Sequence, residues 1–253
     1  MKTALTIAGS DPTGGAGLQA DLKVFRAFHV HGTSVVTAVT AQNTRSVDSF
    51  LPVSRECVEQ QLRVLLQDIT PDAVKTGMLY SIWAAELVAN MFRGYSLKNL
   101  VIDPVTVSST GISLIEDGIL DGIKEKLFPV ARIITPNIYE ASLLSGVSIE
   151  DRKDMETAAR ILLDTGVESV VITGGHLEDI ALDLFYDGTL YALEGSKMKG
   201  MYHGTGCAFS AAITALLAQG SSTLEAVMGA KEFITGAIQG AYYPGKGMGI
   251  LKL

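Results

Sequence analysis

The chain has 253 residues, of which 47% are hydrophobic and 26 are glycine, and its formal net charge is −7. This length and composition are typical of one soluble α/β domain, expected to span 1–253, and the acidic balance argues against a nucleic-acid partner. The most apolar run, 208–218, is interrupted by Ser210 and Thr214 and falls well short of the roughly 20 residues of a membrane span. Two cysteines give no disulfide framework, which predicts a reducing, cytoplasmic location.

Strands and helices are predicted to alternate along the chain. Continuous apolar runs, typical of strands covered on both faces, predict strands at 4–8, 34–41, 73–76, 100–103, 132–135 and 169–173. Helical patterns occur at 18–28, 55–66, 82–92, 119–127, 138–144, 155–163 and 208–217, and a capping box at Ser222 and Glu225 starts a last helix. Asp187-Gly188 predicts a hairpin with a type I′ turn, hence an antiparallel edge on a mostly parallel sheet between helices.

Glycines and polar residues gather where the predicted strands end. They follow the strands in turn as Gly9-Ser-Asp-Pro-Thr-Gly-Gly-Ala-Gly17, Gln42-Asn43, Lys75-Thr-Gly-Met78, Asp103-Pro104, Thr135-Pro-Asn-Ile-Tyr-Glu140 and Gly174-Gly-His176. Open parallel sheets bind ligands beyond the carboxyl ends of their strands. Any one of these segments fits ordinary turn chemistry, but six on one rim predict a ligand cleft.

The segment His203-Gly-Thr-Gly-Cys207 is a glycine-rich turn that leads directly into an apolar helix. Gly204 and Gly206 let backbone N–H groups converge, and the helix adds its unpaired N–H groups and its positive dipole end. This pattern is typical of a site for phosphate or for a phosphoryl group in transfer. A thiol placed like that of Cys207, at a helix N-terminus, is expected to have a lowered pKa. The alternative is a tight loop before a buried helix.

Two acidic positions suggest metal chemistry. Asp103 ends an apolar strand, where an unpaired charge is costly, so it needs either Mg²⁺ with nucleotide phosphates or a nearby Lys. Asn137 and Glu140 lie three residues apart at a helix start and face the same way. They suit either a metal-bound water or capping of that helix.

Asp21 lies on the buried stripe of the 18–28 helix, together with Leu18, Leu22 and Phe25. A carboxylate on that face, beside a glycine-rich loop, either caps loop amides or contacts a ligand. The residues alone leave both roles open.

Two other nucleotide-binding classes are disfavoured by the sequence. Gly15-Ala-Gly-Leu-Gln-Ala20 matches a dinucleotide fingerprint, but the second strand ends in Gln42-Asn43 where that fingerprint needs an acid, and the next acid is Asp48. This argues against an NAD-dependent oxidoreductase. A Walker-A kinase is excluded because no G-x-x-x-x-G-K-[ST] occurs in the chain.

Several motifs occur in an order that resembles a known family. They are Ala-Gly-Ser-Asp-Pro-Thr-Gly-Gly-Ala-Gly-Leu-Gln-Ala-Asp-Leu-Lys (8–23), Thr-Ala-Gln-Asn-Thr (40–44), Val-Lys-Thr-Gly-Met-Leu (74–79), Val-Ile-Asp-Pro-Val (101–105), Thr-Pro-Asn-x-x-Glu (135–140), Gly-Gly-His (174–176) and His-Gly-Thr-Gly-Cys (203–207). Together they resemble the hydroxymethylpyrimidine/phosphomethylpyrimidine kinases of thiamine biosynthesis, in the ribokinase-like superfamily. The resemblance implies a three-layer α/β/α sandwich, commonly a homodimer. It also implies that ATP and Mg²⁺ serve to phosphorylate 4-amino-5-hydroxymethyl-2-methylpyrimidine to its monophosphate and then to the diphosphate.

The resemblance also implies roles for individual residues. Gln42 would recognise the pyrimidine, and its amide can both donate and accept for the ring amino edge. The remaining expectations are Gly9, Asp21 and Met78 for the substrate pocket, Asp103 and Glu140 for the metal, Asn137, Gly175, Thr205 and Lys246 for the nucleotide, Gly204, Thr205 and Gly206 for an anion hole, and Cys207 as the catalytic base. Sugar-kinase relatives carry Asp at the position of Cys207.

The chain departs from the family at two positions. Many members have Lys where this chain has Thr173, and many have Lys in the loop that here reads Val107-Ser-Ser-Thr-Gly111. Because both lysines would neutralise phosphate charge, their absence bears on the second phosphorylation more than on the first. Lys75 or Lys246 could substitute. A pyridoxal or pyridoxine kinase of the same superfamily is the rival enzyme, and a non-catalytic binding regulator is the alternative from another class.

Overall fold

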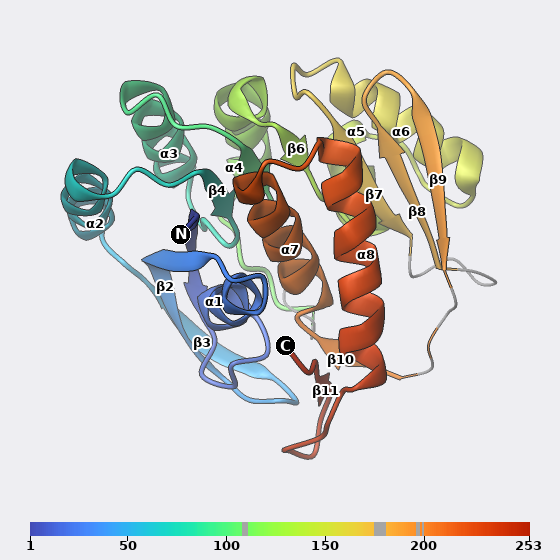
Figure 1. Ribbon diagram of the computed structural model, residues 1–253, viewed down its shortest axis with the longest axis horizontal. Coiled ribbons are helices and arrows are strands. Elements are labelled where there is room, and N and C mark those ends of the chain that lie inside the picture. The colour runs from blue at the N-terminus through green and yellow to red at the C-terminus, as the bar shows by residue number, and fades with distance from the viewer. Residues whose placement is uncertain (108–110, 175–180, 196–197, 199) are drawn as a thin grey trace.

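The computed structural model describes residues 1–107, 111–174, 181–195, 198 and 200–253 (Figure 1). In this part of the chain one sheet has the strand order β3-β2-β1-β4-β5-β6-β7-β8-β9. Strands β2, β1, β4, β5, β6 and β7 pair in parallel. At the two edges, β3 runs antiparallel to β2, β8 antiparallel to β7, and β9 antiparallel to β8. The strand bounds are Thr3–Ser10, His31–Gln42, Val47–Pro52, Ala73–Thr76, Leu100–Ile102, Ile133–Ile134, Val170–Gly174, Ala181–Tyr186 and Leu190–Gly195 for β1 to β9.

Helices cover both faces of the sheet, which confirms the three-layer α/β/α sandwich. One face carries α1 (Gly17–Ala27), α7 (Thr205–Gln219) and α8 (Thr223–Gln239), seen in front of the sheet in Figure 1. The other carries α2 (Arg55–Asp68), α3 (Ile82–Gly94), α4 (Ile119–Gly122), α5 (Ile138–Ser145) and α6 (Arg152–Leu163). Because side chains alternate along a strand, Leu100 and Ile102 enter one core and Val101 the other.

The predicted strands and helices are confirmed to within a few residues, except for one helix, and three strands were not predicted: β3 and the two-residue strands Tyr202–His203 and Gly249–Ile250. The edge strand β3 was not predicted, because its residues are mostly exposed or half-buried and show neither an apolar run nor a clean alternation. The predicted 119–127 helix divides into α4 and a π-helical turn, Ile123–Leu127. No helix in the described ranges combines the length and the apolar character that crossing a membrane requires.

The hairpin between β8 and β9 is present, but the predicted type I′ turn is wrong. That turn needs positive φ at both central residues, whereas Gly188 has φ +103° and Asp187 is not among the positive-φ residues. Instead, the side chain of Asp187 accepts a hydrogen bond from the Thr189 N–H at 3.1 Å, which holds a three-residue turn.

Candidate active site

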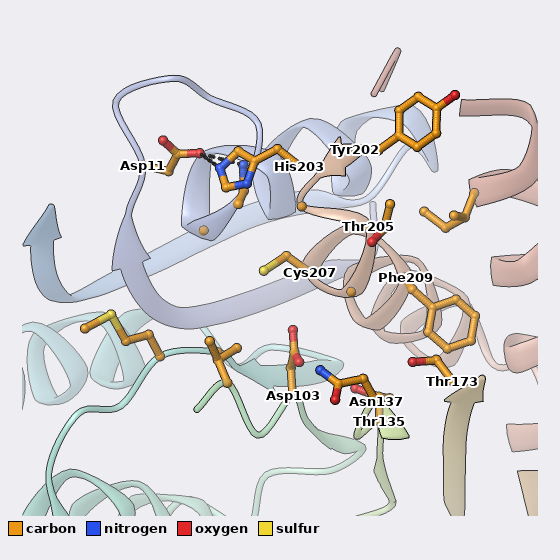
Figure 2. A pocket seen from close by; sticks show the side chains of 18 of the residues that line it. Asp11, Asp103, Thr135, Asn137, Thr173, Tyr202, His203, Thr205, Cys207 and Phe209 are labelled. Carbon is orange, nitrogen blue, oxygen red and sulfur yellow. Dashed lines mark hydrogen bonds and ion pairs between the residues drawn. The ribbon is translucent and has the colours of Figure 1, made fainter. Parts of the chain in front are cut away.

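A cavity of about 860 Å³ lies beyond the carboxyl ends of the parallel strands, where the sequence predicted a cleft. Its wall combines the strand-end segments with the start of α7, so that residues far apart in the sequence face one space. Figure 2 shows Cys207, Asp103 and Asn137 around this space. Five of its residues are Gly9, Gln42, Met78, Asp103 and Glu140.

The glycine-rich turn before α7, residues 204–207, is called the cradle below, and it has the helix-start geometry that the sequence predicted. Gly204 is the N-cap residue of α7 with φ +79°, and a Cβ on it would overlap the carbonyl oxygen of Gly15. Glycine is therefore required there. A Cβ on Gly206 would meet no atom within 4 Å, so this position faces open space. The first helical bond joins the Ala208 N–H to the Gly204 carbonyl, so the N–H groups of residues 205–207 have no acceptor within the helix.

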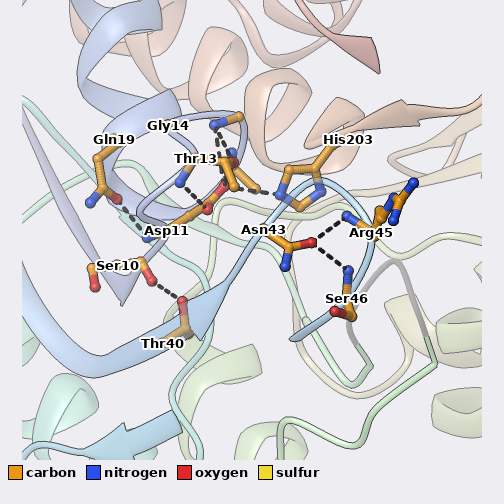
Figure 3. A network of polar contacts seen from close by, with 12 residues as sticks. Ser10, Asp11, Thr13, Gly14, Gln19, Thr40, Asn43, Arg45, Ser46 and His203 are labelled. Atoms are coloured by element: carbon orange, nitrogen blue, oxygen red, sulfur yellow. Dashed lines mark hydrogen bonds and ion pairs between the residues drawn. The ribbon is translucent and has the colours of Figure 1, made fainter. Parts of the chain in front are cut away.

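Asp11 holds the first glycine-rich loop in shape. Its buried carboxylate accepts hydrogen bonds from the backbone N–H groups of Thr13, Gly15 and Ala16 at 2.8–3.2 Å (Figure 3). Nε2 of His203 lies 2.9 Å from the same carboxylate, which ties this loop to the strand β10 (Tyr202–His203) just before the cradle. Burial would raise the pKa of Asp11, but His203 and the hydrogen bonds from Thr13 hold it below its usual value.

Asp21 does not line the cavity, and both roles considered for it from the sequence are wrong. Its side chain is fully buried and accepts hydrogen bonds from Oγ1 of Thr6 at 2.6 Å and from Nζ of Lys75 at 3.0 Å. The loop amides are capped by Asp11 instead. Asp21 therefore fixes the buried ammonium of Lys75, a residue of the cavity wall, and its own assignment to the substrate pocket is corrected.

Asp103 faces the cavity with a Lys and a Ser as neighbours. Nζ of Lys75 lies 3.8 Å from its carboxylate, and Oγ of Ser210 donates a 3.0 Å hydrogen bond to it. Burial raises the pKa of Asp103, and Lys75 and Ser210 oppose that rise. The nearby Lys expected as one alternative is thus present, but it is shared with Asp21, so the two carboxylates outnumber the one ammonium.

Asn137 and Glu140 form the capping box of α5. Oδ1 of Asn137 accepts from the Glu140 N–H at 2.9 Å, and the Glu140 carboxylate accepts from the Asn137 N–H at 3.0 Å. Burial, together with the charge of Asp103, raises the pKa of Glu140 to about 8. The capping role is confirmed, and both side chains also line the cavity.

The Cys207 thiol reaches the cavity from the first turn of α7. Burial and the Asp103 carboxylate raise its pKa to about 12, against smaller opposing effects of Lys75 and of the Gly17 N–H. The expectation of a lowered pKa at this helix N-terminus is therefore wrong, because burial and the neighbouring Asp103 carboxylate outweigh the groups that favour the thiolate.

Three of the residues expected at the substrate pocket line the same cavity. Gln42 ends β2, and Gly9 and Met78 meet at the cavity wall, where a Cβ on Gly9 would lie 3.1 Å from Sδ of Met78. Met78 is held by a hydrogen bond from Oγ1 of Thr37 to its carbonyl at 2.5 Å.

Lys75 and Lys246, the two lysines expected to substitute for the missing family lysines, have different surroundings. Lys246 is exposed and is not part of the described cavity wall, so its assignment to the nucleotide stays a prediction. Lys75 is fully buried between two carboxylates. Lys231 on α8 was missed: it lines the cavity near Thr173, with Nζ 2.8 Å from Asp183. Nothing in the sequence marks it, because it sits among ordinary helix residues. Gly175 lies outside the described residues.

A family model described as phosphomethylpyrimidine kinase matches residues 11–252. The hydroxymethylpyrimidine/phosphomethylpyrimidine kinase of Streptomyces coelicolor is 43% identical over 97% of this chain and 91% of that protein. The thiamine biosynthesis bifunctional protein of Geobacter sulfurreducens is also 43% identical, but this chain spans 51% of its length.

Solved structures show the same fold. The ADP complex of Bacillus subtilis pyridoxal kinase is 40% identical with a TM-score of 0.92, covering all of this chain and 97% of that one. Phosphomethylpyrimidine kinase from Clostridium difficile is 38% identical with a TM-score of 0.83, covering 94% of this chain and 100% of that one. The ribokinase-like fold is thereby confirmed. Since the family match covers residues 11–252, which is nearly the whole chain, this chain belongs to the phosphomethylpyrimidine kinase family.

Proposed function

We propose that the protein transfers the γ-phosphoryl group of ATP to the hydroxymethyl group of 4-amino-5-hydroxymethyl-2-methylpyrimidine and then phosphorylates the monophosphate, in thiamine biosynthesis. The observation that carries this proposal is one cavity lined both by the Gln42 amide and by the helix N-terminal cradle. Gln42, Gly9 and Met78 would hold the planar ring, with the Gln42 amide on the ring amino edge.

The opposite end of the cavity suits a nucleotide. Phe209, Ile234 and Ile238 give an apolar surface of the kind that holds a base, and Asn137 and Thr205 add polar groups beside it. Lys231 supplies a positive charge in this wall, close to the position where many family members have a Lys and this chain has Thr173. It is our candidate for neutralising phosphate charge in the second phosphorylation.

The donors in the cavity fit Mg²⁺, which prefers oxygen and is held by one or two carboxylates together with substrate phosphates. Asp103 and Glu140 are such carboxylates, and the effect of Asp103 on the Glu140 pKa shows that their charges repel. No group of three or more ligating His, Cys, Asp or Glu occurs in the described ranges, in keeping with an ion shared with phosphates. Bound there, Mg²⁺ would neutralise phosphate charge.

We expect Asp103→Asn to raise the Mg²⁺ concentration for half-maximal activity and lower kcat, and an unchanged Mg²⁺ titration would contradict this role.

Phosphoryl transfer depends more on positioning and charge stabilisation than on a strong base. The amides of residues 205–207 would stabilise the transferring group, and Cys207 would accept the proton of the substrate hydroxyl.

We also propose a homodimer, as is common in the family. The paired, exposed side chains of Val39 and Leu51 on the edge hairpin are candidates for its contact. Molar mass from light scattering distinguishes dimer from monomer.

A pyridoxal kinase is the second candidate, since the Bacillus subtilis pyridoxal kinase structure superposes on this chain with the higher TM-score. The decisive experiment measures ATP turnover with the pyrimidine, its monophosphate and pyridoxal in parallel. Higher kcat/KM for the pyrimidine supports the proposal, whereas higher kcat/KM for pyridoxal replaces it by the second candidate. Absence of turnover with all three would indicate a binding regulator.

A further inference from the structure

The segment between α8 and the C-terminal residues, 243–250, is called the strap here, and it crosses to the turn between β2 and β3. The Met248 N–H donates to the Thr44 carbonyl at 2.9 Å, and the Gly247 N–H donates to Oγ1 of Thr44 at 3.2 Å. Nε of Arg45 donates to the Lys246 carbonyl at 3.4 Å. Backbone and side-chain groups of one turn are thus held by three consecutive strap residues.

The strap approaches this turn too closely for larger residues. A Cβ on Gly247 would overlap the Thr44 carbonyl and would lie 2.8 Å from the Arg45 backbone nitrogen. Because these obstructing atoms belong to the backbone, no side-chain rotation could relieve the overlap. The glycine therefore serves the contact between strap and turn.

The other end of the strap joins the phosphate cradle. Its last two residues form β11 (Gly249–Ile250), which pairs in parallel with β10, with Tyr202 opposite Gly249 and His203 opposite Ile250. The Gly249 N–H also donates to the Met201 carbonyl at 2.9 Å. The chain passes from β10 directly into Gly204, the N-cap of α7.

One short segment thus connects the two working ends of the cavity. Its Thr44 contact lies two residues after Gln42, and its β11 pairing ends one residue before the cradle. Gln42 and Met248 line the cavity, whereas neither Thr44 nor Gly247 is among its described wall residues. A change at Thr44 or Gly247 would therefore act on the site through position and not through contact with a ligand.

We propose that the strap is a positioning segment, which sets the β2–β3 turn carrying Gln42 at a fixed distance from the cradle that holds the transferring phosphoryl group. This inference rests on the proposed function, because it assigns the substrate ring to Gln42. In physical terms, the strap places the hydroxymethyl oxygen at the cradle, and an error of about 1 Å in such placement lowers rates by roughly a hundredfold.

The test uses two variants that disturb the strap and two controls. Gly247→Ala forces the strap off the turn, and Thr44→Val removes the hydroxyl that accepts from Gly247. Thr44→Ser keeps that hydroxyl. Gly236→Ala on α8 is the matched glycine control, because a Cβ there meets nothing within 4 Å and Gly236 does not line the cavity.

We expect Gly247→Ala and Thr44→Val to raise the pyrimidine KM by about tenfold and to lower kcat. The Kd for ADP without pyrimidine should stay within about twofold, because neither Gly247 nor Thr44 is among the described wall residues of the cavity. Thr44→Ser and Gly236→Ala should match the wild type. Amide hydrogen exchange of residues 43–46 should be faster in Gly247→Ala.

Two results would overturn the proposal. One is that the Gly247→Ala and Thr44→Val variants both fold and both keep the wild-type pyrimidine KM and kcat. The other is an equal loss of ADP affinity and pyrimidine affinity with a lower Tm, which marks the strap as a general stability element. Failure of the wild type to phosphorylate the pyrimidine would refute the proposed function instead. In that case the hydrogen-exchange measurement still tests the strap without any substrate: unchanged exchange of residues 43–46 in Gly247→Ala would refute the restraint of the turn by the strap.

Discussion

Cys207 is influenced by two neighbours that act on its thiol in opposite directions. The Asp103 carboxylate disfavours the thiolate, and Lys75 favours it, while burial disfavours it most. With a pKa of about 12, only about one thiol in 10⁵ is ionised at pH 7. A cation that neutralised Asp103 would remove the effect of this carboxylate and so lower the thiol pKa toward a more usable base, while burial and Asp21 would still oppose ionisation.

We therefore expect Cys207→Ala to lower kcat by about 10²–10⁴-fold, the usual contribution of a general base, with the fold intact. Cys207→Asp should recover part of this loss, since it restores a proton acceptor at the same position. The measurement is single-turnover phosphorylation at saturating Mg²⁺·ATP. Less than about a fivefold loss, with chemistry rate-limiting, would assign the catalysis to the cradle amides alone.

Gln42 permits a test of the pyrimidine end of the cavity. Gln42→Leu keeps the size of the side chain and removes both the donor and the acceptor. A partner left unpaired costs about 1–3 kcal/mol, so the pyrimidine KM should rise roughly ten- to a hundredfold, with the KM for ATP nearly unchanged. Steady-state kinetics with each substrate varied separately checks this. An unchanged pyrimidine KM would place the ring elsewhere.

At the scale of elements, the start of α7 is held by the first glycine-rich loop. The contact between His203 and Asp11 joins the two, and Gly15 leaves room for the imidazole, since a Cβ there would lie 2.8 Å from Cδ2 of His203. This arrangement fixes the cradle against α1 and the end of β1.

We expect His203→Leu to lower kcat at least tenfold, because loss of a hydrogen bond to a buried carboxylate costs about 1.5–3 kcal/mol and releases the cradle. His203→Gln can still donate near the Nε2 position and should keep more activity. Comparison of kcat and Tm for the two variants is the measurement. Equal, wild-type kcat in both would show that the cradle needs no such support.

The sequence predicts elements well where burial is two-sided and poorly where it is not. Strand β4 was predicted with the right bounds because all four of its residues are buried. The edge strand β3 and the short pair β10–β11 carry no such pattern, so the strap contacts were invisible. For the site, the rim motifs predicted which segments meet. They could not show which of Asp11 and Asp21 caps the loop, since that depends on the distance of Lys75.

For the whole molecule, Glu140 links stability to pH. Its pKa rises from 4.5 to about 8 on folding. Between these values the folded protein keeps a proton that the unfolded chain has lost, so stability falls as pH rises, by at most about 1.4 kcal/mol per pH unit.

Glu140→Gln removes this titration and keeps a residue suited to the capping box. Without Mg²⁺, we expect the free energy of unfolding of the wild type to fall from pH 5 to pH 8 more steeply than that of the variant. Urea unfolding at several pH values measures both. Parallel profiles would mean that Glu140 ionises normally in the folded state.

The raised pKa at Cys207 also makes the two cysteines chemically unequal. Alkylating reagents react with thiolates, and Cys57 is exposed on α2 whereas the Cys207 thiol is held protonated beside Asp103. A limiting amount of iodoacetamide should therefore add a single label, at Cys57, and leave the Cys207 sulfur unmodified. This difference offers a selective attachment point for a fluorophore on an outer helix, in a protein whose cavity thiol needs no mutation to be spared.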